Sequence, residues 1–462
     1  METIYSIAKS WTCTAGSCHS LDEICSWVQE RNETVAVEIH KNRLEDSDFW
    51  FYDREEGCIR NQNRSFFTIT GYQQTMADGT ILSQPIILQQ EIGYLGILCR
   101  EIGGVMHFLM QAKIEPGNVN KIQISPTIQA TKSNFTQKHG GAKPPYLEYF
   151  LNASKYEIVV DQIQSEQSSR FYKKRNRNIL IRVEEEVPVL PSHRWMTLGQ
   201  LKHLMHEDNL VNMDTRTVIS CIPYAKLNLS PLELLELSDG FRDKALFRSV
   251  FVGAKENMLP EVYQYINDQK MFVEAKRELL PLHELVNWEM RDGELVCKDL
   301  YPFKVIFCDI AIEDREVKHW TQPLFEANGI ATFGLICCEE DGVLKFLVKA
   351  MPEVGCFDSV ELGPTVQREA VAIAQDEDEV NRFFKERLAT GQGVIFDHLL
   401  SEEGGRFYHE QNRNVLMRVD RSELPPLPVG YFLLNYRTLN ELVQVNNTLN
   451  IQLRDLLSLL EA

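Results

Sequence analysis

The 462-residue sequence lacks the features that mark membrane, secreted and nucleic-acid-binding proteins. It has no run of about 18 apolar residues, and its first residues, METIYSIAKSWTC, lack a basic end followed by a sustained apolar stretch. Its formal net charge of −18 argues against broad binding to phosphate backbones or anionic membranes, because such binding needs a basic surface. We therefore expect a cytoplasmic protein that binds neither nucleic acid nor membrane.

Disulfide and metal-ligand patterns are also missing. The eleven cysteines, an odd number, are scattered without paired spacing, and Cys337 and Cys338 adjoin in an apolar run. We expect most of them to be reduced core residues, and we assign no metal. No catalytic triad or phosphate loop can be read either, which keeps a binding protein without catalytic activity open as an alternative to an enzyme.

The chain does contain an internal repeat. Adding 238 to a residue number in the first half repeatedly gives the same residue type, as for Leu21 and Leu259, Trp50 and Trp288, Glu115 and Glu353, and Gln129 and Gln367. The offset then becomes 236, at which RFYKKRNRN at 170–178 matches RFYHEQNRN at 406–414. The sequence therefore predicts a first copy at 1–225, a helical linker at 226–239 and a second copy at 240–462. In the linker, Ser230 and Pro231 suit a helix N-cap and first turn.

Both copies mix helices with strands. Each opens with a predicted helix, LDEICSWVQERN or LPEVYQYINDQK, and continues through strand-like runs such as GVMHFLMQAKI and GVLKFLVKA. A late helix, TLGQLKHLMHEDN or TLNELVQVNNTLN, follows in each. Because strands and helices alternate within each copy, the predicted class is α/β or α+β with a mixed sheet.

The two copies differ most in one stretch, where QAKIEPGNVNKIQISPTIQATKSNF becomes KAMPEVGCFDSVELGPTVQREAVAI. Lys113 becomes Met351, and Thr131 becomes Glu369. Hydrogen-bonding side chains are lost from the second copy, so we expect the active site in the first copy and a degenerate or structural second copy. The alternative for any single amide or hydroxyl is that it satisfies a buried backbone group.

Five strings carry a resemblance to a known family: QAKIEPGN, QISPTIQATKSNFTQKHGG, PPYLEYF, WTQPL and SEEGGRFYHEQNRN. At these strings, which span nearly the whole chain, the sequence resembles the NDP-hexose 2,3-dehydratases of deoxysugar biosynthesis. The resemblance implies two tandem Nudix-like α/β/α domains, a homodimer and no organic cofactor. The glutamate-rich REUxEE helix of Nudix phosphohydrolases is absent from both copies, so hydrolysis of a nucleotide sugar is the less favoured alternative.

The resemblance also implies a reaction. The substrate would be dTDP-4-keto-6-deoxyglucose, which loses water across C2 and C3 to give a 3,4-diketo-2,6-dideoxy sugar, the substrate of a 3-ketoreductase. This elimination needs a base for the C3 hydrogen, a group that stabilises the enolate, and an acid for the C2 hydroxyl. Lys113 and Glu115 lie two apart on a strand-like run and share a face, so they are candidates for the base and the oxyanion partner. Glu115 persists as Glu353, which leaves a structural role open, and His139 and Tyr146 are alternative acid or base groups.

The remaining candidates are predicted to bind the substrate. Neutral amides and hydroxyls suit sugar hydroxyls, and cationic side chains suit the diphosphate. The predicted binding residues are Gln84, Gln111, Asn118, Gln123, Ser125, Gln129, Thr131, Lys132, Ser133, Asn134, Arg170 and Tyr172. Trp50 or Phe66 would stack on thymine, with core packing as the alternative for either.

Overall fold

The computed structural model describes residues 2–15, 18–132, 143–253, 257–313, 315, 317–371 and 378–462. The first copy contains α1 (Glu2–Trp11), α2 (Leu21–Thr34), β1 (Val37–Asn42), β2 (Trp50–Asp53), β3 (Cys58–Asn61), β4 (Thr68–Met76), β5 (Ile81–Leu88), β6 (Gly93–Ile102), β7 (Val105–Ile114), β8 (Ile122–Ser125), β9 (Ile128–Ala130), α4 (Leu147–Leu151), β10 (Glu157–Ser165), β11 (Arg175–Arg182), β12 (His193–Thr197), α5 (Leu198–Leu204) and α6 (Met213–Ser220). After α7 (Pro231–Gly240) and α8 (Lys244–Phe247), the second copy contains α9 (Leu259–Phe272), β13 (Ala275–Leu280), β14 (Trp288–Arg291), β15 (Glu294–Cys297), β16 (Phe303–Ile312), β17 (His319–Ala327), β18 (Thr332–Glu340), β19 (Val343–Met351), β20 (Glu361–Gly363), β21 (Val366–Arg368), α10 (Glu379–Thr390), β22 (Val394–Ser401), β23 (Phe407–Tyr408), β24 (Gln411–Val419), β25 (Tyr431–Asn435), α11 (Tyr436–Val443) and α12 (Ile451–Ser458).

The predicted mixed α/β class is confirmed. In the first copy, a large sheet has the order β10-β11-β6-β7-β12, with β8 and β9 paired to its central strands. Strand β11 runs parallel to β6, whereas β6 and β7 form an antiparallel pair. The second copy repeats this arrangement with β22, β24, β18, β19 and β25, so the internal repeat of the sequence is also a repeat of sheet topology.

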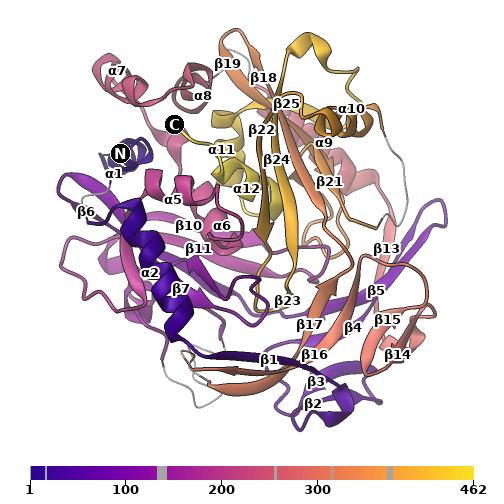
Figure 1. The fold of residues 1–462 in the computed structure, drawn as a ribbon. Helices are drawn as coiled ribbons and strands as arrows, with labels where there is room; N and C mark the ends of the chain where they lie inside the picture. Colours follow the sequence, from indigo (N-terminus) through magenta and orange to yellow (C-terminus); the bar gives the residue numbers. More distant parts are fainter. Residues whose placement is uncertain are drawn as a thin grey trace.

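The two copies exchange their first strands. Strand β1 of the first copy pairs with β16 of the second, and β13 of the second copy pairs with β4 of the first. Figure 1 shows β1 running along β16 at the bottom of the view, with β13 beside β4 and β5. Each small sheet therefore contains one strand of the other copy, and this exchange brings loops of the second copy close to strands of the first.

A shared hydrophobic core joins the copies further. The largest cluster of buried apolar side chains runs from Ile7 in α1 to Leu460 after α12. Trp11 packs against Tyr224 and Phe241, with ring centroids 5.3 Å away in both cases. Its indole Nε1 donates a hydrogen bond to the carbonyl oxygen of Leu460 at 3.1 Å, so the two ends of the chain lie side by side. Burial of apolar area on this scale is the main source of folding free energy.

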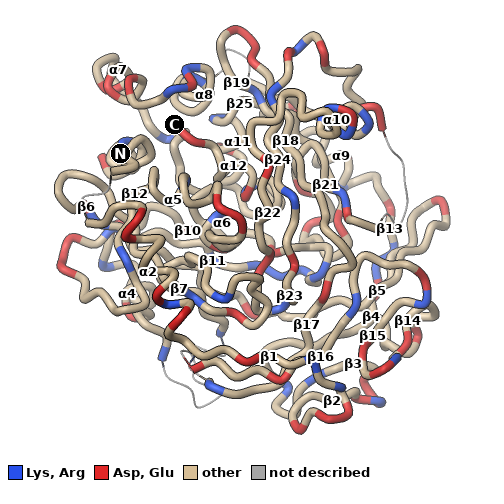
Figure 2. Tube along the Cα trace, viewed as in Figure 1, with Lys and Arg blue, Asp and Glu red and all other residues tan. Residues whose placement is uncertain are grey.

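The helix predicted in the linker is present as α7 and begins at the predicted cap. Ser230 is the N-cap of α7, Pro231 stands in its first turn, and Glu233 completes a capping box, which together satisfy the first backbone N–H groups. Seven of the eleven cysteines are buried thiols, as expected for core residues. Figure 2 shows acidic and basic residues intermixed along the trace. None of the described helices is long and apolar enough to cross a membrane.

Two glycines let the copies approach closely. Gly117, just after β7, donates its N–H to the carbonyl oxygen of Gly404 at 2.7 Å and accepts from the N–H of His409 at 2.8 Å. Gly355, its equivalent in the second copy, makes the same two contacts with Ser168 and Lys173. A Cβ on Gly117 would lie 1.6 Å from the carbonyl oxygen of Phe407, so no side chain fits there.

We expect Gly117→Ala to destabilise the protein and to displace the loop at 402–410. Overpacking of a tight contact costs about 1–3 kcal/mol and sometimes more. Thermal unfolding should therefore show a midpoint lowered by several degrees, whereas Gly104→Ala, at a turn where a Cβ meets nothing within 4 Å, changes only local backbone strain. An unfolding midpoint for Gly117→Ala equal to that of the wild type would contradict the close contact.

Candidate active site

A cavity of about 690 Å³ lies between the two copies, a size that suits a ligand as large as a nucleotide sugar. The first copy lines it from β1 to β3, from the ends of β7 and β9, from β11 and from α6. The second copy lines it from β16, β17 and the loop at 402–410. The cavity therefore belongs to neither copy alone.

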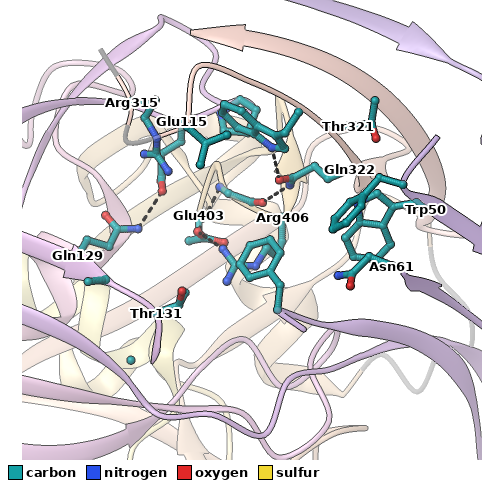
Figure 3. Close-up of a pocket in the computed structure, with 18 of the residues that line it drawn as sticks. Trp50, Asn61, Glu115, Gln129, Thr131, Arg315, Thr321, Gln322, Glu403 and Arg406 are labelled. Carbon is teal, nitrogen blue, oxygen red and sulfur yellow. Dashed lines mark hydrogen bonds and ion pairs between the residues drawn. The ribbon is translucent and has the colours of Figure 1, made fainter. Parts of the chain in front are cut away.

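The cavity has an aromatic end and a polar end. Figure 3 shows Trp50 and Asn61 at one side, Gln129 and Thr131 at the other, and Glu403 and Arg406 between them. Phe49 and Phe66 also line the aromatic end. An apolar platform next to convergent polar groups is typical of a site that binds a small-molecule ligand.

A buried cluster stands at the end of β7. The Lys113 ammonium donates to the carbonyl oxygen of Gln129 at 3.0 Å and lies 3.9 Å from Glu115 Oε1. Gln129 Nε2, on β9, donates to the same Oε1 at 3.0 Å, and Asn212 Nδ2 donates to Gln129 Oε1 at 3.3 Å. Because Asn212 is also the N-cap of α6, the chain of contacts fixes this helix against the two strands.

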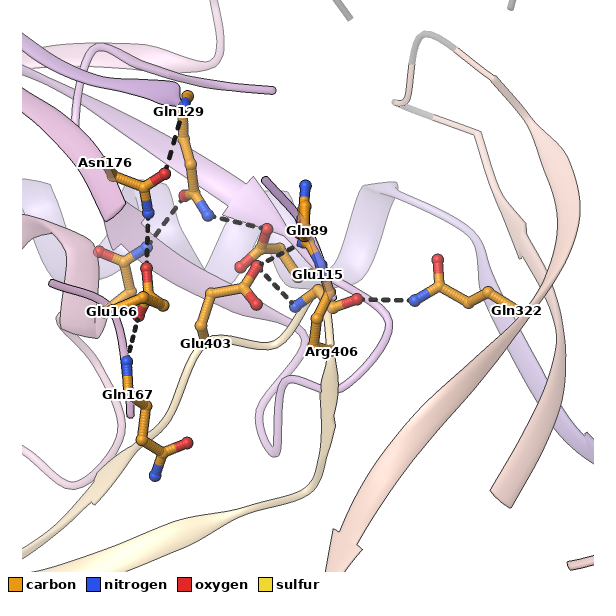
Figure 4. Close-up of polar contacts among 12 residues, drawn as sticks. Gln89, Glu115, Gln129, Glu166, Gln167, Asn176, Gln322, Glu403 and Arg406 are labelled. Atoms are coloured by element: carbon orange, nitrogen blue, oxygen red, sulfur yellow. Dashed lines mark hydrogen bonds and ion pairs between the residues drawn. The ribbon is translucent and has the colours of Figure 1, made fainter. Parts of the chain in front are cut away.

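The second copy supplies an ion pair to the same cavity. Arg406 donates from one terminal nitrogen to Glu403 Oε1 at 3.0 Å and from the other to Gln89 Oε1 at 2.9 Å. Its guanidinium group lies over the ring of Phe66, 4.5 Å from the ring centroid. Gln322 Nε2 donates to the carbonyl oxygen of Gly405 at 2.6 Å and fixes the loop from behind. Figure 4 shows Glu403 and Arg406 facing Glu115, with Gln322 beyond them.

The cavity is lined by more acidic than basic side chains. Burial raises the pKa of Glu403 to about 7, against the opposing effect of Arg406. Burial also raises the pKa of Asp214 on α6 well above its usual range, and Glu166, Glu403 and Glu115 add to the rise. Burial lowers the pKa of the Lys174 ammonium to about 8, and the Arg406 charge adds to this. Burial therefore favours the protonated form of Asp214, and Glu403 and Lys174 titrate near the working range.

Because the copies are repeats, each cavity residue has an equivalent in the other copy, and several of these equivalents also lie together. We call this set the counterpart cluster. It consists of Met351, Glu353, Gln367, Glu369 and Glu410 of the second copy with Gln84, Gln167 and Arg170 of the first. Gln367 donates to Glu353, as Gln129 does to Glu115. Arg170 lies over Phe303 but pairs with Glu369 at 3.0 Å, whereas Arg406 pairs with Glu403. Glu369 stands at the position equivalent to Thr131.

Comparison with known proteins identifies the family. The model of the family described as NDP-hexose 2,3-dehydratase matches residues 21–222 and again 259–460. The chain belongs to the NDP-hexose 2,3-dehydratase family. A relative from Saccharopolyspora spinosa is 39% identical over 95% of this chain and 91% of its own length. Others from Amycolatopsis orientalis and Streptomyces violaceoruber are 32% and 36% identical, over 99% and 94% of this chain and 93% and 95% of their own lengths. All three are named dTDP-4-dehydro-6-deoxy-alpha-D-glucopyranose 2,3-dehydratase.

The resemblance predicted from the sequence strings is thus confirmed, and the protein is an enzyme of the lyase type. Of the residues predicted for catalysis and binding, the structure brings Lys113, Glu115, Gln129 and Thr131 together in the cavity. Trp50 and Phe66, predicted to stack on thymine, line its aromatic end.

Other predicted residues lie elsewhere. Tyr146 donates its hydroxyl to the carbonyl oxygen of Pro188 and packs on His193, away from the cavity. Gln123 donates to Ser401 Oγ at 2.6 Å, and the buried Ser125 accepts from Asn212, so both serve contacts between elements. The predicted residues that do not line the cavity are Gln84, Gln111, Asn118, Gln123, Ser125, Lys132, Tyr146, Arg170 and Tyr172. Ser133, Asn134 and His139 fall outside the described residues.

The exchange explains why Arg170 and Gln84 lie elsewhere. Both belong to the first copy but stand in the counterpart cluster, where Gln84 Nε2 donates to the carbonyl oxygen of Ser169 at 2.7 Å. Their equivalents Arg406 and Gln322 line the cavity in their place. Lys174, Asp214 and Glu403 also line the cavity, although the sequence did not single them out. The aligned strings RFYKKRNRN and RFYHEQNRN did carry one signal, the change from Lys174 to Glu410.

Proposed function

We propose that the cavity between the copies is where a dTDP-4-keto-6-deoxyhexose loses water across C2 and C3. One observation carries this proposal: an enclosed cluster of Lys113, Glu403 and Asp214 faces a cavity large enough for the whole nucleotide sugar. The positions equivalent to these three residues hold Met351, Gln167 and Gln452. Gln452 is equivalent to Asp214 because each lies two residues after the N-cap of its helix, Asn450 of α12 and Asn212 of α6. At these three positions, the ammonium and both acids of the cavity are thus replaced by uncharged side chains.

The two ends of the cavity would bind different parts of the nucleotide sugar. The thymine would stack at Trp50 and Phe49, in the aromatic end. The diphosphate would contact Arg406, whose buried Nε has no hydrogen-bond partner and whose guanidinium group lies between the two ends. The sugar would then reach the polar end, where Gln129 and Thr131 offer hydrogen bonds to its hydroxyls.

Three groups would carry the elimination. A base removes the C3 hydrogen, which is acidic because it lies next to the C4 ketone. The Lys113 ammonium stabilises the enolate oxygen that forms, since a fixed cation in a buried site stabilises developing negative charge strongly. The protonated Asp214 gives its proton to the C2 hydroxyl as that group leaves as water. Glu115, held by Gln129, keeps Lys113 in place.

Asp214→Asn is expected to block loss of the C2 hydroxyl without blocking removal of the C3 proton. We expect product formation to fall by about 10²-fold or more, because the C2 hydroxyl then leaves without an acid. Exchange of the C3 hydrogen with deuterated solvent should persist, since the enolate still forms and is reprotonated. Asp208→Asn, an exposed change outside the cavity, should alter neither rate. Equal loss of exchange and product formation in Asp214→Asn would contradict the role of this acid.

The proposed reaction is tested directly with purified protein and the 4-keto sugar nucleotide. The expected product is a 3,4-diketo-2,6-dideoxy sugar, captured by reduction with a 3-ketoreductase. Release of dTMP that depends on magnesium would instead indicate hydrolysis of the Nudix type. Binding of the nucleotide sugar without any turnover would indicate a binding protein and would contradict the proposal.

Three finer features follow from the family resemblance. We propose that each copy, at 1–225 and 240–462 around the linker at 226–239, derives from a Nudix-like α/β/α domain. We also propose that two chains form a homodimer, which light scattering of the purified protein would test. In the cytoplasm, a separate 3-ketoreductase would then consume the unstable diketo product.

A further inference from the structure

We propose that Glu403, contributed by the second copy, is the base that takes the C3 proton of the sugar. This inference rests on the proposed function and assigns its central proton transfer. It also gives the second copy a catalytic part, whereas the sequence comparison predicted a degenerate or structural copy.

The contacts of Glu403 leave one carboxylate oxygen for the substrate. Oε1 accepts from Arg406 at 3.0 Å and from the N–H of Gly405 at 3.1 Å. Oε2 is buried and has no hydrogen-bond partner, although the residue lines the cavity and is only 8% exposed. Unpartnered buried oxygens are rare in folded proteins, because burying one without a hydrogen bond costs free energy. A substrate group that meets this oxygen would offset the cost.

The loop that carries Glu403 is fixed from both copies. On one side, Gly117 of the first copy makes two backbone hydrogen bonds with this loop. On the other, the N–H of Phe325 in β17 donates to the carbonyl oxygen of Arg406 at 2.8 Å. A base held in this way loses little entropy when it meets the substrate, which favours proton transfer.

Glu115 is the competing candidate, and its contacts argue for a positioning role. Its Oε1 accepts from Gln129, and the equivalent Glu353 accepts from Gln367 in the counterpart cluster. The same interaction therefore persists where Lys113 has become Met351. Glu403, in contrast, is replaced there by Gln167, which has the same size and no basic oxygen. Figure 4 shows Gln167 pointing away from the Glu403 cluster.

The proton transfers balance without a further reactant. Glu403 takes the C3 proton, and the electron pair of the C–H bond moves into the C4 enolate beside Lys113. The enolate then expels the C2 hydroxyl, which leaves as water with the proton of Asp214, and a double bond forms between C2 and C3. The resulting enol becomes the 3,4-diketo sugar when its C3 hydroxyl loses a proton and C2 gains one, with no net change in protons. Glu403 is left protonated and Asp214 ionised, and one proton passed from Glu403 to Asp214 restores both groups.

Glu403→Gln tests the inference. Gln has the same size as Glu and stands at the equivalent position 167. We expect product formation and C3 deuterium exchange to fall together by about 10²- to 10⁴-fold, the usual contribution of a general base. Affinity for dTDP, measured by calorimetry, should stay within about threefold of the wild type, since the substitution removes no group assigned to the nucleotide. Gln167→Glu, the mirror change in the counterpart cluster, should leave turnover unchanged.

The pH profile gives an independent readout. The charged or titratable groups that face Glu403 are Arg406, Lys113, Lys174, Glu115, Glu166 and Asp214. Because the pKa of Glu403 is about 7, the base is protonated below that pH, and kcat/KM should fall about tenfold for each unit of pH below it. Glu403→Gln should lose this step and keep only its low residual rate.

Different results would contradict the role of Glu403 and the proposed function. If the wild type turns over and Glu403→Gln retains more than a tenth of its product formation and exchange, Glu403 is not the base. If Glu115→Gln alone abolishes exchange, Glu115 takes that role. If the wild type binds dTDP but neither exchanges the C3 hydrogen nor forms product, the proposed function itself fails.

Discussion

Lys113→Met is expected to lower kcat by about 10²- to 10³-fold, which corresponds to about 3–4 kcal/mol of transition-state stabilisation. The ammonium is buried, donates to the carbonyl oxygen of Gln129 and lies 3.9 Å from Glu115. Methionine has nearly the same length, stands at the equivalent position 351, and carries no charge to stabilise an enolate. The measurement is steady-state turnover of the 4-keto substrate, with dTDP affinity as the test that the variant is folded.

The matched control lies in the counterpart cluster. Gln367→Ala removes an amide that bonds Glu353 and Asn450, and it should leave turnover largely intact. A large loss of activity there would mean that the counterpart cluster contributes to catalysis. Wild-type turnover in Lys113→Met would remove Lys113 from the reaction.

Thr131→Glu is expected to close the cavity. In the counterpart cluster, Glu369 at the equivalent position pairs with Arg170 at 3.0 Å. A glutamate at 131 would extend toward Arg406, which lies over Phe66 as Arg170 lies over Phe303, and it would compete with Glu403 for this cation. It would occupy the space proposed for the sugar, and its charge would repel the diphosphate. We expect affinity for the nucleotide sugar to fall by about 100-fold or more, measured by calorimetry.

The control for this change keeps the size of the side chain. Thr131→Val removes the hydroxyl without adding charge or length, so it should lower affinity by about tenfold at most, the usual effect of one hydrogen bond. Equal losses in the two variants would show that the hydroxyl matters and that filling of the cavity does not. Unchanged binding in Thr131→Glu would place the sugar elsewhere.

The repeat could be predicted from the sequence because equivalent positions of the two copies hold the same residue types at a fixed offset. The family model matches the chain at 21–222 and 259–460, the same spacing that pairs Leu21 with Leu259. Helix caps such as Ser230 are local signals, so α7 was predicted correctly. Lys113 and Glu115 were predicted to share a face, and both line the cavity.

Only part of the site could be predicted from the sequence. The constant offset between the copies identifies equivalent residues, but it does not show which copy contributes each residue to the cavity. The reciprocal pairing of β1 with β16 and of β13 with β4 crosses the copies over. Arg170 was therefore proposed for a cavity that Arg406 lines. A carboxylate gained by the second copy is also not found among the groups that this copy has lost. At Gln167 and Glu403 it is the second copy that holds the carboxylate.

The most direct test of the central claim is a crystal structure of the Glu403→Gln variant with the 4-keto sugar nucleotide bound. We expect density for the nucleotide sugar in the cavity between the copies, with C3 facing position 403 and the C4 oxygen within hydrogen-bonding distance of Lys113. Density for the sugar beside Arg170 and Glu369, with the cavity empty, would contradict it.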